Sequence, residues 1–214
     1  MKDKKGKTGK DAFNGISKKT AVIAVYVALV VAAQAVLSFA AGVEVVSLLI
    51  CVFCVVFGLR MGMVMTISFV ILRGLIFPYT YLNILIDYAL YFPIFALVTG
   101  LYGKLLNGLY GERQTLAESG QDLKNPVFRT LNAKCAACFA VLTVICAALT
   151  CLFTLIDDAV WPLVFHASRG GAIAYFYNSL PTLVTHVVCV TVSMAFLFNP
   201  AYKALDVAKR GLNG

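Results

Sequence analysis

Residues 20–40 read TAVIAVYVALVVAAQAVLSFA, an apolar run without a charged side chain. A helix needs about 20 such residues to cross the hydrocarbon core of a bilayer. The run is too long for the apolar core of a signal peptide, and no convincing cleavage site follows it. We therefore interpret it as the first membrane span.

Similar runs recur along the 214 residues, of which 61% are hydrophobic and 13% charged. A soluble domain carries about 25% charged residues, so a soluble chain of this composition could not cover its own surface. We expect an all-α polytopic membrane protein, a compact bundle of about six transmembrane helices. The predicted spans are residues 20–40, 43–59, 61–77, 81–104, 131–156 and 178–198, which form one membrane domain over residues 20–202.

Four polar segments flank or connect these spans. Residues 1–19 are rich in Lys and Gly without an apolar period, which is typical of a disordered tail. Residues 105–130 hold several charged side chains and are predicted to form a cytoplasmic loop, and residues 157–177 are predicted to form an outer loop. Residues 203–214 are a second basic tail on the cytoplasmic side.

Lys and Arg side chains indicate the orientation, because they are enriched on the cytoplasmic side of membrane proteins. With the N-terminus inside, only Arg73 and Arg169 of the 18 lysines and arginines fall on the outer side. Both termini are therefore predicted to be cytoplasmic, which requires an even number of spans. The surplus of basic residues is a topology signal, and we expect no nucleic-acid partner.

Two charged side chains lie about one turn inside the outer ends of predicted spans. They are Arg73 in the third span and Asp87 in the fourth. Such a group is costly in hydrocarbon unless it is paired, hydrated or facing a cavity. Two interpretations stay open: an Arg73–Asp87 ion pair that pins two helices, or residues that line a ligand cavity open to the outside.

Other polar side chains also gather in the outer halves of the spans, while the inner halves are mostly apolar. Asn83, Asp87 and Tyr91 are spaced four apart, so they share one face of a helix. Asn178, Thr182, His186 and Cys189 fall along one face of the sixth span, starting at its outer end, and Gln34 and Ser38 mark the outer half of the first. A channel would need polar residues through the full depth, so the pattern favours a pocket closed at the bottom and open to the outside.

The first span repeats Ala24, Ala28 and Ala32 at a spacing of four. Small residues at this spacing leave a groove where another helix can approach closely. Gln34 lies about 120° around the helix from the centre of this stripe, so one face could serve a partner and another the pocket. Chance or packing inside the bundle is the alternative explanation of the stripe.

Several stretches follow one another in an order and spacing that resemble a known family. A basic tail precedes the alanine-striped helix, VEVVS at residues 43–47 leads to FGLRMG at 57–62, and LIDYAL at 85–90 ends in GLYG at 100–103. A loop with Trp161 and His166 then precedes YFYN at 175–178. Over residues 20–202 the chain is similar to the substrate-binding S components of energy-coupling factor (ECF) vitamin transporters.

This resemblance implies a multi-pass subunit in the plasma membrane of a prokaryote that binds a vitamin or similar small molecule from outside. It would dock on a transmembrane coupling subunit and two cytoplasmic ATPases, so ATP hydrolysis would belong to the partners, and this chain would be no enzyme and hold no cofactor. The docking face would be Ala24, Ala28 and Ala32. From the resemblance and the polar pattern together, the expected substrate-binding residues are Asn83, Asp87, Arg73, Trp161, His166, Tyr175, Asn178, His186 and Gln34.

Some of these residues have simpler explanations. Trp161 could anchor the chain at the membrane interface and not cover a pocket. His166 could be solvated or could contact an anionic group of a ligand. Asp157 and Asp158 fit the point where a helix meets water better than a catalytic pair.

Two rival readings concern metal and catalysis. The pairs Cys51–Cys54 and Cys135–Cys138 could hold zinc if their helices met, but scattered cysteines in apolar helices more often behave as small hydrophobes. We expect neither a metal site nor a disulfide framework. The sequence contains no HExxH and no GxSxG motif, which disfavours an intramembrane enzyme; a non-transport scaffold or assembly subunit is the stronger alternative to a transporter.

Overall fold

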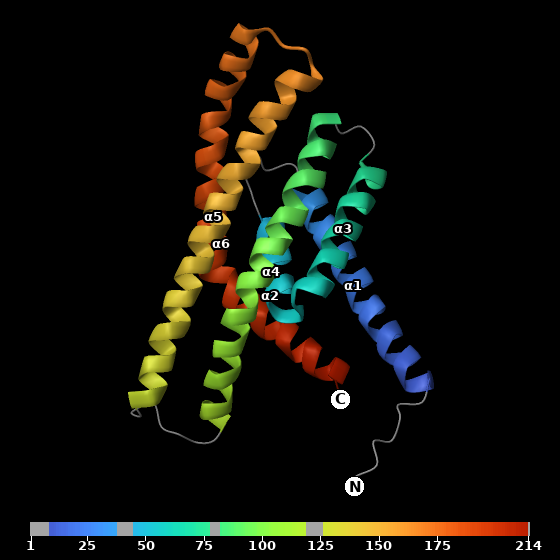
Figure 1. Cartoon of the computed structure of the whole chain (residues 1–214), viewed down its shortest axis with the longest axis vertical. Helices are drawn as coiled ribbons and strands as arrows, with labels where there is room; N and C mark the ends of the chain where they lie inside the picture. Colours follow the sequence, from blue (N-terminus) through green and yellow to red (C-terminus); the bar gives the residue numbers. More distant parts are fainter. Residues whose placement is uncertain (1–8, 38–44, 78–81, 119–125, 214) are drawn as a thin grey trace.

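The computed structural model describes residues 9–37, 45–77, 82–118 and 126–213, which form six α-helices (Figure 1). They are α1 (Gly9–Leu37), α2 (Val45–Phe57), α3 (Leu59–Ile76), α4 (Leu82–Glu118), α5 (Pro126–Val164) and α6 (Arg169–Asn213). Among the described residues, five helices are long and apolar enough to cross a membrane, and α2 is a shorter apolar helix. The predicted all-α membrane bundle is confirmed.

Helix α2 is the centre of the bundle and packs against α1, α3, α4 and α6. Its sequence, VVSLLICVFCVVF, is apolar all round, as expected of a helix that faces protein on every side. Every residue from Ile50 to Val56 is buried. Its 13 residues span about 20 Å, less than the ~30 Å hydrocarbon core, so the predicted second span is a buried central helix that does not face lipid.

Two glycines allow the chain to turn and pack closely around α2. Gly58 joins α2 to α3 with φ +83°, a backbone conformation that residues with a Cβ rarely adopt, and so makes the tight turn between the two helices. Gly103 lets α4 press against α2, because a Cβ at this position would lie 2.8 Å from the Cα of Val55.

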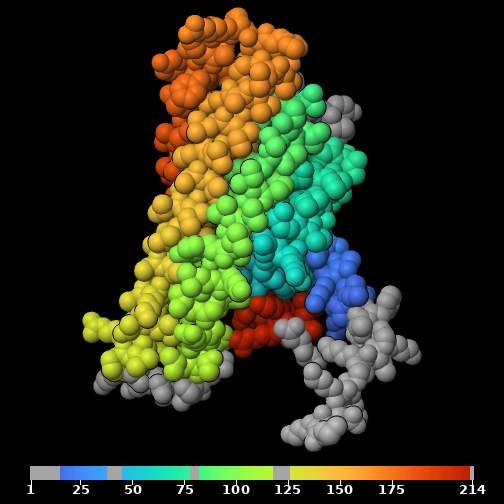
Figure 2. Space-filling view, viewed as in Figure 1, coloured from blue at the N-terminus to red at the C-terminus, as the bar shows by residue number. Residues whose placement is uncertain are grey.

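Helices α5 and α6 are the longest, with 39 and 45 residues. At 1.5 Å per residue they measure about 58 and 68 Å, well beyond the ~30 Å hydrocarbon core. Figures 1 and 2 show this pair, coloured from yellow to red, rising past α3 and α4 at one end. That end holds the α5–α6 turn and lies opposite the start of α1 and the end of α6; we call it the outer end and the other the inner end, following the charge rule.

The last part of α6 bends near Pro200 and runs beneath α2 (Figure 1). A proline inside a helix removes one hydrogen bond and clashes with the preceding turn, which produces such a bend. Lys209 Nζ then donates a hydrogen bond of 2.6 Å to the carbonyl oxygen of Val56. The end of α6 thereby satisfies one of the carbonyls left open in the last turn of α2.

Apolar side chains cover the outside of the bundle. On α4 the exposed residues Leu90, Ile94, Leu97 and Leu101 follow helical spacing along one face. An exposed apolar face of this length is unusual in a soluble monomer and is the surface that lipid would cover.

The helices extend beyond the predicted boundaries, into the segments expected to be tails and loops. Helical residues occupy 9–19 of the expected disordered tail, 105–118 and 126–130 of the cytoplasmic loop, 157–164 and 169–177 of the outer loop, and 203–213 of the second tail. Adding a residue to an existing helix costs far less than nucleating one, and many of these segments are rich in good helix formers such as Ala, Leu, Glu and Lys. Residues 1–8 and 119–125 lie outside the described residues.

Candidate functional site

Asp157 lies near the outer end of α5, about two turns before the helix ends at Val164. Asn83 Nδ2 of α4 donates a hydrogen bond of 3.1 Å to its Oδ1, and Tyr175 Oη of α6 donates one of 2.7 Å to its Oδ2. A carboxylate can accept about four hydrogen bonds. Asp157 therefore links α4, α5 and α6 and keeps lone pairs for a further donor.

Asp87 lies one turn along α4 from Asn83 and belongs to the same group. Its side chain is 1% exposed, and its carboxyl group lies against that of Asp157. Its Oδ1 has no hydrogen-bond partner among the residues that the structure describes. Two carboxylates this close repel each other when both are ionised, so they either hold a proton between them or attract a positive charge.

A pocket of about 480 Å³ adjoins the carboxylate of Asp157 and is lined by Asn83, Ile84, Asp157, Trp161, Phe165 and Tyr175. The rings of Trp161 and Tyr175 are stacked, with centroids 4.2 Å apart and planes 3° from parallel. The side chain of Asn83 is 4% exposed, and its Oδ1 has no partner within the described part of the chain. The pocket thus combines an aromatic wall with an unused buried acceptor.

A second pocket of about 240 Å³ lies on the other side of Tyr175, lined by Phe153, Thr154, Asp157, Tyr175, Asn178, Ser179, Thr182 and His186. It shares Asp157 and Tyr175 with the first pocket. The buried Oγ1 of Thr154 and Nδ1 of His186 have no hydrogen-bond partner among the described residues. We call the two pockets, together with Asp87, the Asp157 site.

Arg73 and Gln34 meet at Tyr88, the residue that follows Asp87. The Arg73 guanidinium carbon lies 4.1 Å from the centroid of the Tyr88 ring, a cation–π contact, and Gln34 Nε2 donates a hydrogen bond of 2.6 Å to Tyr88 Oη. The structure places Asp87 against Asp157, so the Arg73–Asp87 ion pair that the sequence allowed does not form between these described residues.

The expected site residues fall into three groups. Those in the Asp157 site are Asn83, Asp87, Trp161, Tyr175, Asn178 and His186. Arg73 and Gln34 lie beside it, on Tyr88. His166 lines neither pocket and is exposed in the short α5–α6 turn with φ +50°, so the structure does not bring it together with the others, and its expected role in binding stays a prediction.

Asp157 is the central residue that sequence reasoning missed. The sequence predicts that the fifth span ends at Ile156, so that Asp157 and Asp158 mark the point where the helix meets water. Because α5 continues to Val164, Asp157 and Trp161 lie one turn apart on the same helix face. Phe153, Asp157 and Trp161 are spaced four apart, and this repeat was the signal that could have revealed the site. Asp158 lines neither pocket and accepts a hydrogen bond of 2.9 Å from Ser179 Oγ.

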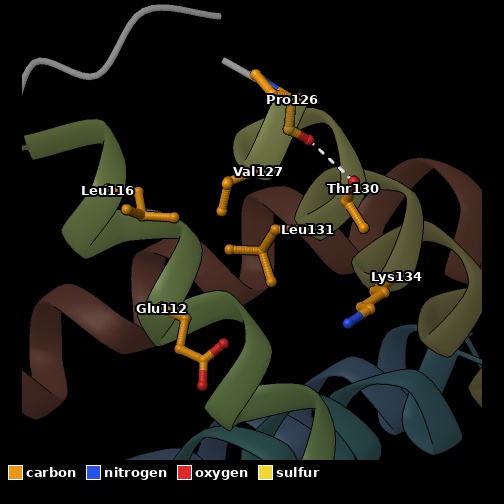
Figure 3. Close-up of a pocket in the computed structure, with 7 residues that line it drawn as sticks. All are labelled: Glu112, Leu116, Pro126, Val127, Thr130, Leu131 and Lys134. Carbon is orange, nitrogen blue, oxygen red and sulfur yellow. Dashed lines mark hydrogen bonds between the residues drawn. The ribbon is translucent and has the colours of Figure 1, made fainter.

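A third pocket, of about 390 Å³, lies at the inner end between α4 and α5 (Figure 3). Its lining consists of Glu112, Leu116, Pro126, Val127, Thr130, Leu131 and Lys134. Thr130 Oγ1 donates back to the carbonyl oxygen of Pro126 at 2.9 Å. Among the described residues, none of the buried polar atoms that lack a partner belongs to this inner pocket, so we place the candidate site at the outer end.

The cysteines do not assemble as the two CxxC pairs suggested. Cys51 of α2 lies beside Cys146 of α5, with the sulfur atoms 3.7 Å apart, and Cys138 contacts the hydroxyl of Tyr102. All seven are free thiols. Within the described ranges, no group of three or more His, Cys, Asp or Glu side chains is arranged to hold a metal ion.

The alanine stripe of α1 faces outward. Ala24, Ala28 and Ala32 are all exposed, whereas Tyr26, Val27 and Val30 on the opposite face are buried. Packing inside the bundle therefore does not explain the stripe.

Comparisons of the chain with protein-family models, with curated proteins and with solved structures found no match. The likeness to ECF S components therefore rests on the residues quoted above, and membership of that family is a proposal.

Proposed function

We propose that this chain is a membrane-embedded, substrate-binding subunit of an ECF-type importer. It captures a vitamin or similar small molecule from outside the plasma membrane of a prokaryote. The molecule then passes inward with the help of a transmembrane coupling subunit and two cytoplasmic ATPases, which carry out the ATP hydrolysis.

The Asp157 site is the observation that carries this proposal. It lies at the outer end, it contains two pockets, and several of its buried polar atoms have no partner in the described protein. Each such atom costs free energy unless a ligand or water satisfies it. A site shaped to bind a ligand is a physical reason for the bundle to keep them.

The packing below the site supports capture of a ligand and argues against free passage. Tyr91, Phe92, Phe95, Met194 and Phe198 are each at most 2% exposed and form an aromatic and aliphatic floor. A molecule bound near Asp157 could cross to the inner end only if these helices moved. This agrees with a subunit that needs partners to release its substrate.

The outward-facing alanines of α1 support the docking part of the proposal. Helix association in a bilayer depends on close van der Waals packing, which small residues allow. Ala24, Ala28 and Ala32 offer such a surface to a second membrane protein, while Gln34 is turned inward to Tyr88.

The proposal can be tested without knowing the substrate. The purified full chain and its Asp157→Asn variant would be equilibrated with the same extract of small molecules, and the retained compounds identified by mass spectrometry. We expect a compound that the natural chain retains and that Asp157→Asn loses. An Asp206→Asn variant is the matched control, because Asp206 pairs with Arg210 in the last part of α6 and should retain the compound.

Equal retention of every compound by the natural chain and Asp157→Asn would contradict the proposal. A scaffold or assembly subunit would give that result, since its function does not depend on the pocket.

A further inference from the structure

We infer that the Asp157 site takes an organic cation, a small molecule that carries a protonated amine or a quaternary nitrogen beside a flat ring. The inference rests on the proposed function and narrows the class of substrate. It follows from three properties of the site: its charge, its unused hydrogen-bond acceptors and its aromatic wall.

The charge of the site is one-sided. Asp87 and Asp157 bring two carboxyl groups together, and the described lining of the two pockets contains no lysine or arginine. The buried guanidinium of Arg73 lies on the ring of Tyr88. Negative charge in a membrane interior is costly unless a positive charge balances it, and a cationic ligand would supply that balance in place of a shared proton.

The hydrogen-bonding groups of the larger pocket point to a donor on the ligand. Asn83 Nδ2 and Tyr175 Oη, the donors beside Asp157, are already used by its carboxylate. The buried polar atoms near Asp157 that lack a partner in the described structure include two acceptors, the Oδ1 of Asn83 in the pocket lining and the Oδ1 of Asp87 beside Asp157, both in side chains more than nine-tenths buried. An ammonium group has three donors and no acceptor, so it complements these oxygens, whereas a carboxylate or phosphate would bring further acceptors against them.

The aromatic wall distinguishes an organic cation from a metal ion. Trp161 and Tyr175 are stacked beside the carboxylate and line the same pocket as Phe165. A cation close to the face of an aromatic ring is attracted by the ring electrons, most strongly by tryptophan, and a flat ligand can extend the stack. Metal ions prefer several oxygen, nitrogen or sulfur ligands, and the described residues hold no group of three or more acidic, histidine or cysteine side chains placed to supply them.

Trp161 also provides the readout, because it is the single tryptophan of the chain. The full chain in detergent would be titrated with benzylammonium, benzyl alcohol and benzoate, three probes of similar shape that differ in charge, while tryptophan fluorescence is recorded. We expect a saturable response to benzylammonium at a concentration about ten-fold or more below that of either other probe, as a charge-assisted hydrogen bond would give.

The variants test whether the response comes from this site. Asp157→Asn and Asp87→Asn each remove one of the two charges and should each weaken benzylammonium binding about ten-fold or more. Asp206→Asn is the matched control, because it removes a charge of the same kind from the last part of α6, outside both linings, and should weaken binding less than about three-fold. Gel filtration would show which variants remain folded, and either of the two site variants suffices.

Several results would overturn the inference. Equal or tighter binding of benzyl alcohol or benzoate would remove the preference for a cation but leave the proposed function standing, since the site would still bind a small molecule. Displacement of benzylammonium by calcium chloride would assign the charge to a metal ion. A benzylammonium response that survives in both folded site variants, or no saturable response to any probe, would show that the site does not hold this class; the retained-compound comparison would then decide the proposed function independently.

Discussion

The α4–α5 pair carries a pocket at each end, and the two pockets differ in chemistry more than in size. The larger outer pocket measures about 480 Å³ and the inner one about 390 Å³. The outer pocket surrounds Asp157 with stacked aromatic rings and a buried amide oxygen that lacks a partner in the described structure. The inner pocket is mostly aliphatic, with Glu112 and Lys134 in its lining (Figure 3).

This contrast shows that buried polar groups locate a candidate site better than volume does. An apolar hollow between helix ends costs little, because lipid, solvent or a neighbouring segment can fill it. A buried carboxyl or amide oxygen without a donor costs more, so its presence requires an explanation. Under the proposed function a ligand supplies that explanation at the outer end, and at the inner end none is needed.

The largest expected effect is a loss of uptake without a loss of ligand binding. Ala28→Trp would place an indole on the exposed alanine face and prevent close approach of a partner helix, so uptake by cells should fall to background. Binding of the same compound by the purified subunit should stay unchanged, because Ala28 lies away from the pocket. Val188→Trp, at an exposed position of α6, is the control and should keep uptake. If uptake and binding fall together in Ala28→Trp, the stripe is needed for folding; if neither falls, it faces lipid.

The second prediction concerns the packed interior on which the outer site stands. Gly103→Val would drive a side chain into the backbone of Val55, and such overpacking costs about 1–3 kcal/mol or more. Gly108→Val, on the same helix, meets open space and carries the same change in helix propensity. Thermal unfolding of the two variants in detergent should show a clearly lower midpoint for Gly103→Val. Equal midpoints would mean that α4 does not press on α2 as described.

Asp87→Asn tests the outer site by a moderate effect. The variant keeps the shape of the side chain but removes a charge, so affinity for the retained compound should fall by about ten-fold or more, as expected for loss of a charge-assisted hydrogen bond. Isothermal titration calorimetry on the folded variant would measure it. Unchanged affinity would exclude Asp87 from binding and leave it as a structural neighbour of Asp157.

Glu112→Gln should have the smallest effect on ligand affinity, and it tests whether the two ends of the α4–α5 pair differ in function. Glu112 lies about 44 Å along α4 from Asn83, several times the distance at which salt screens exposed charges. Affinity for the retained compound should therefore change by less than about two-fold. A loss similar to that of Asp87→Asn would make the inner pocket part of the binding function.

The prediction from the sequence and the structure differ in the length of the helices. Apolar runs were sufficient to predict the bundle, because a bilayer requires long uncharged helices. They could not reveal that α5 runs to Val164, since helix beyond the membrane needs no apolar pattern. For that reason the sequence did not predict Asp157 as a site residue. Asn83, Asp87, Trp161 and Tyr175, which were predicted from the polar pattern and the resemblance, do lie around it.

The sequence also could not predict which faces of the helices pack against each other. The sequence offered Arg73 as a partner for Asp87 because both lie at similar depth, but depth does not determine which faces of two helices meet. The structure turns Arg73 to Tyr88 and Asp87 to Asp157. The spacing of Ala24, Ala28 and Ala32 placed them on one face of α1 but left open whether that face packs inside the bundle; the structure shows that they are exposed, and docking on that face stays a prediction.

The most direct measurement asks whether the outer pocket is reached from outside the cell while the inner pocket is not. Asn178→Cys would place a thiol in the lining of the Asp157 site, and Thr130→Cys would place one in the inner pocket. In intact cells a membrane-impermeant maleimide should label Asn178→Cys above the level of the natural chain, and Thr130→Cys should react only after the membrane is permeabilised. Labelling of Thr130→Cys in intact cells, with Asn178→Cys protected until permeabilisation, would contradict the orientation and with it capture of a ligand from outside.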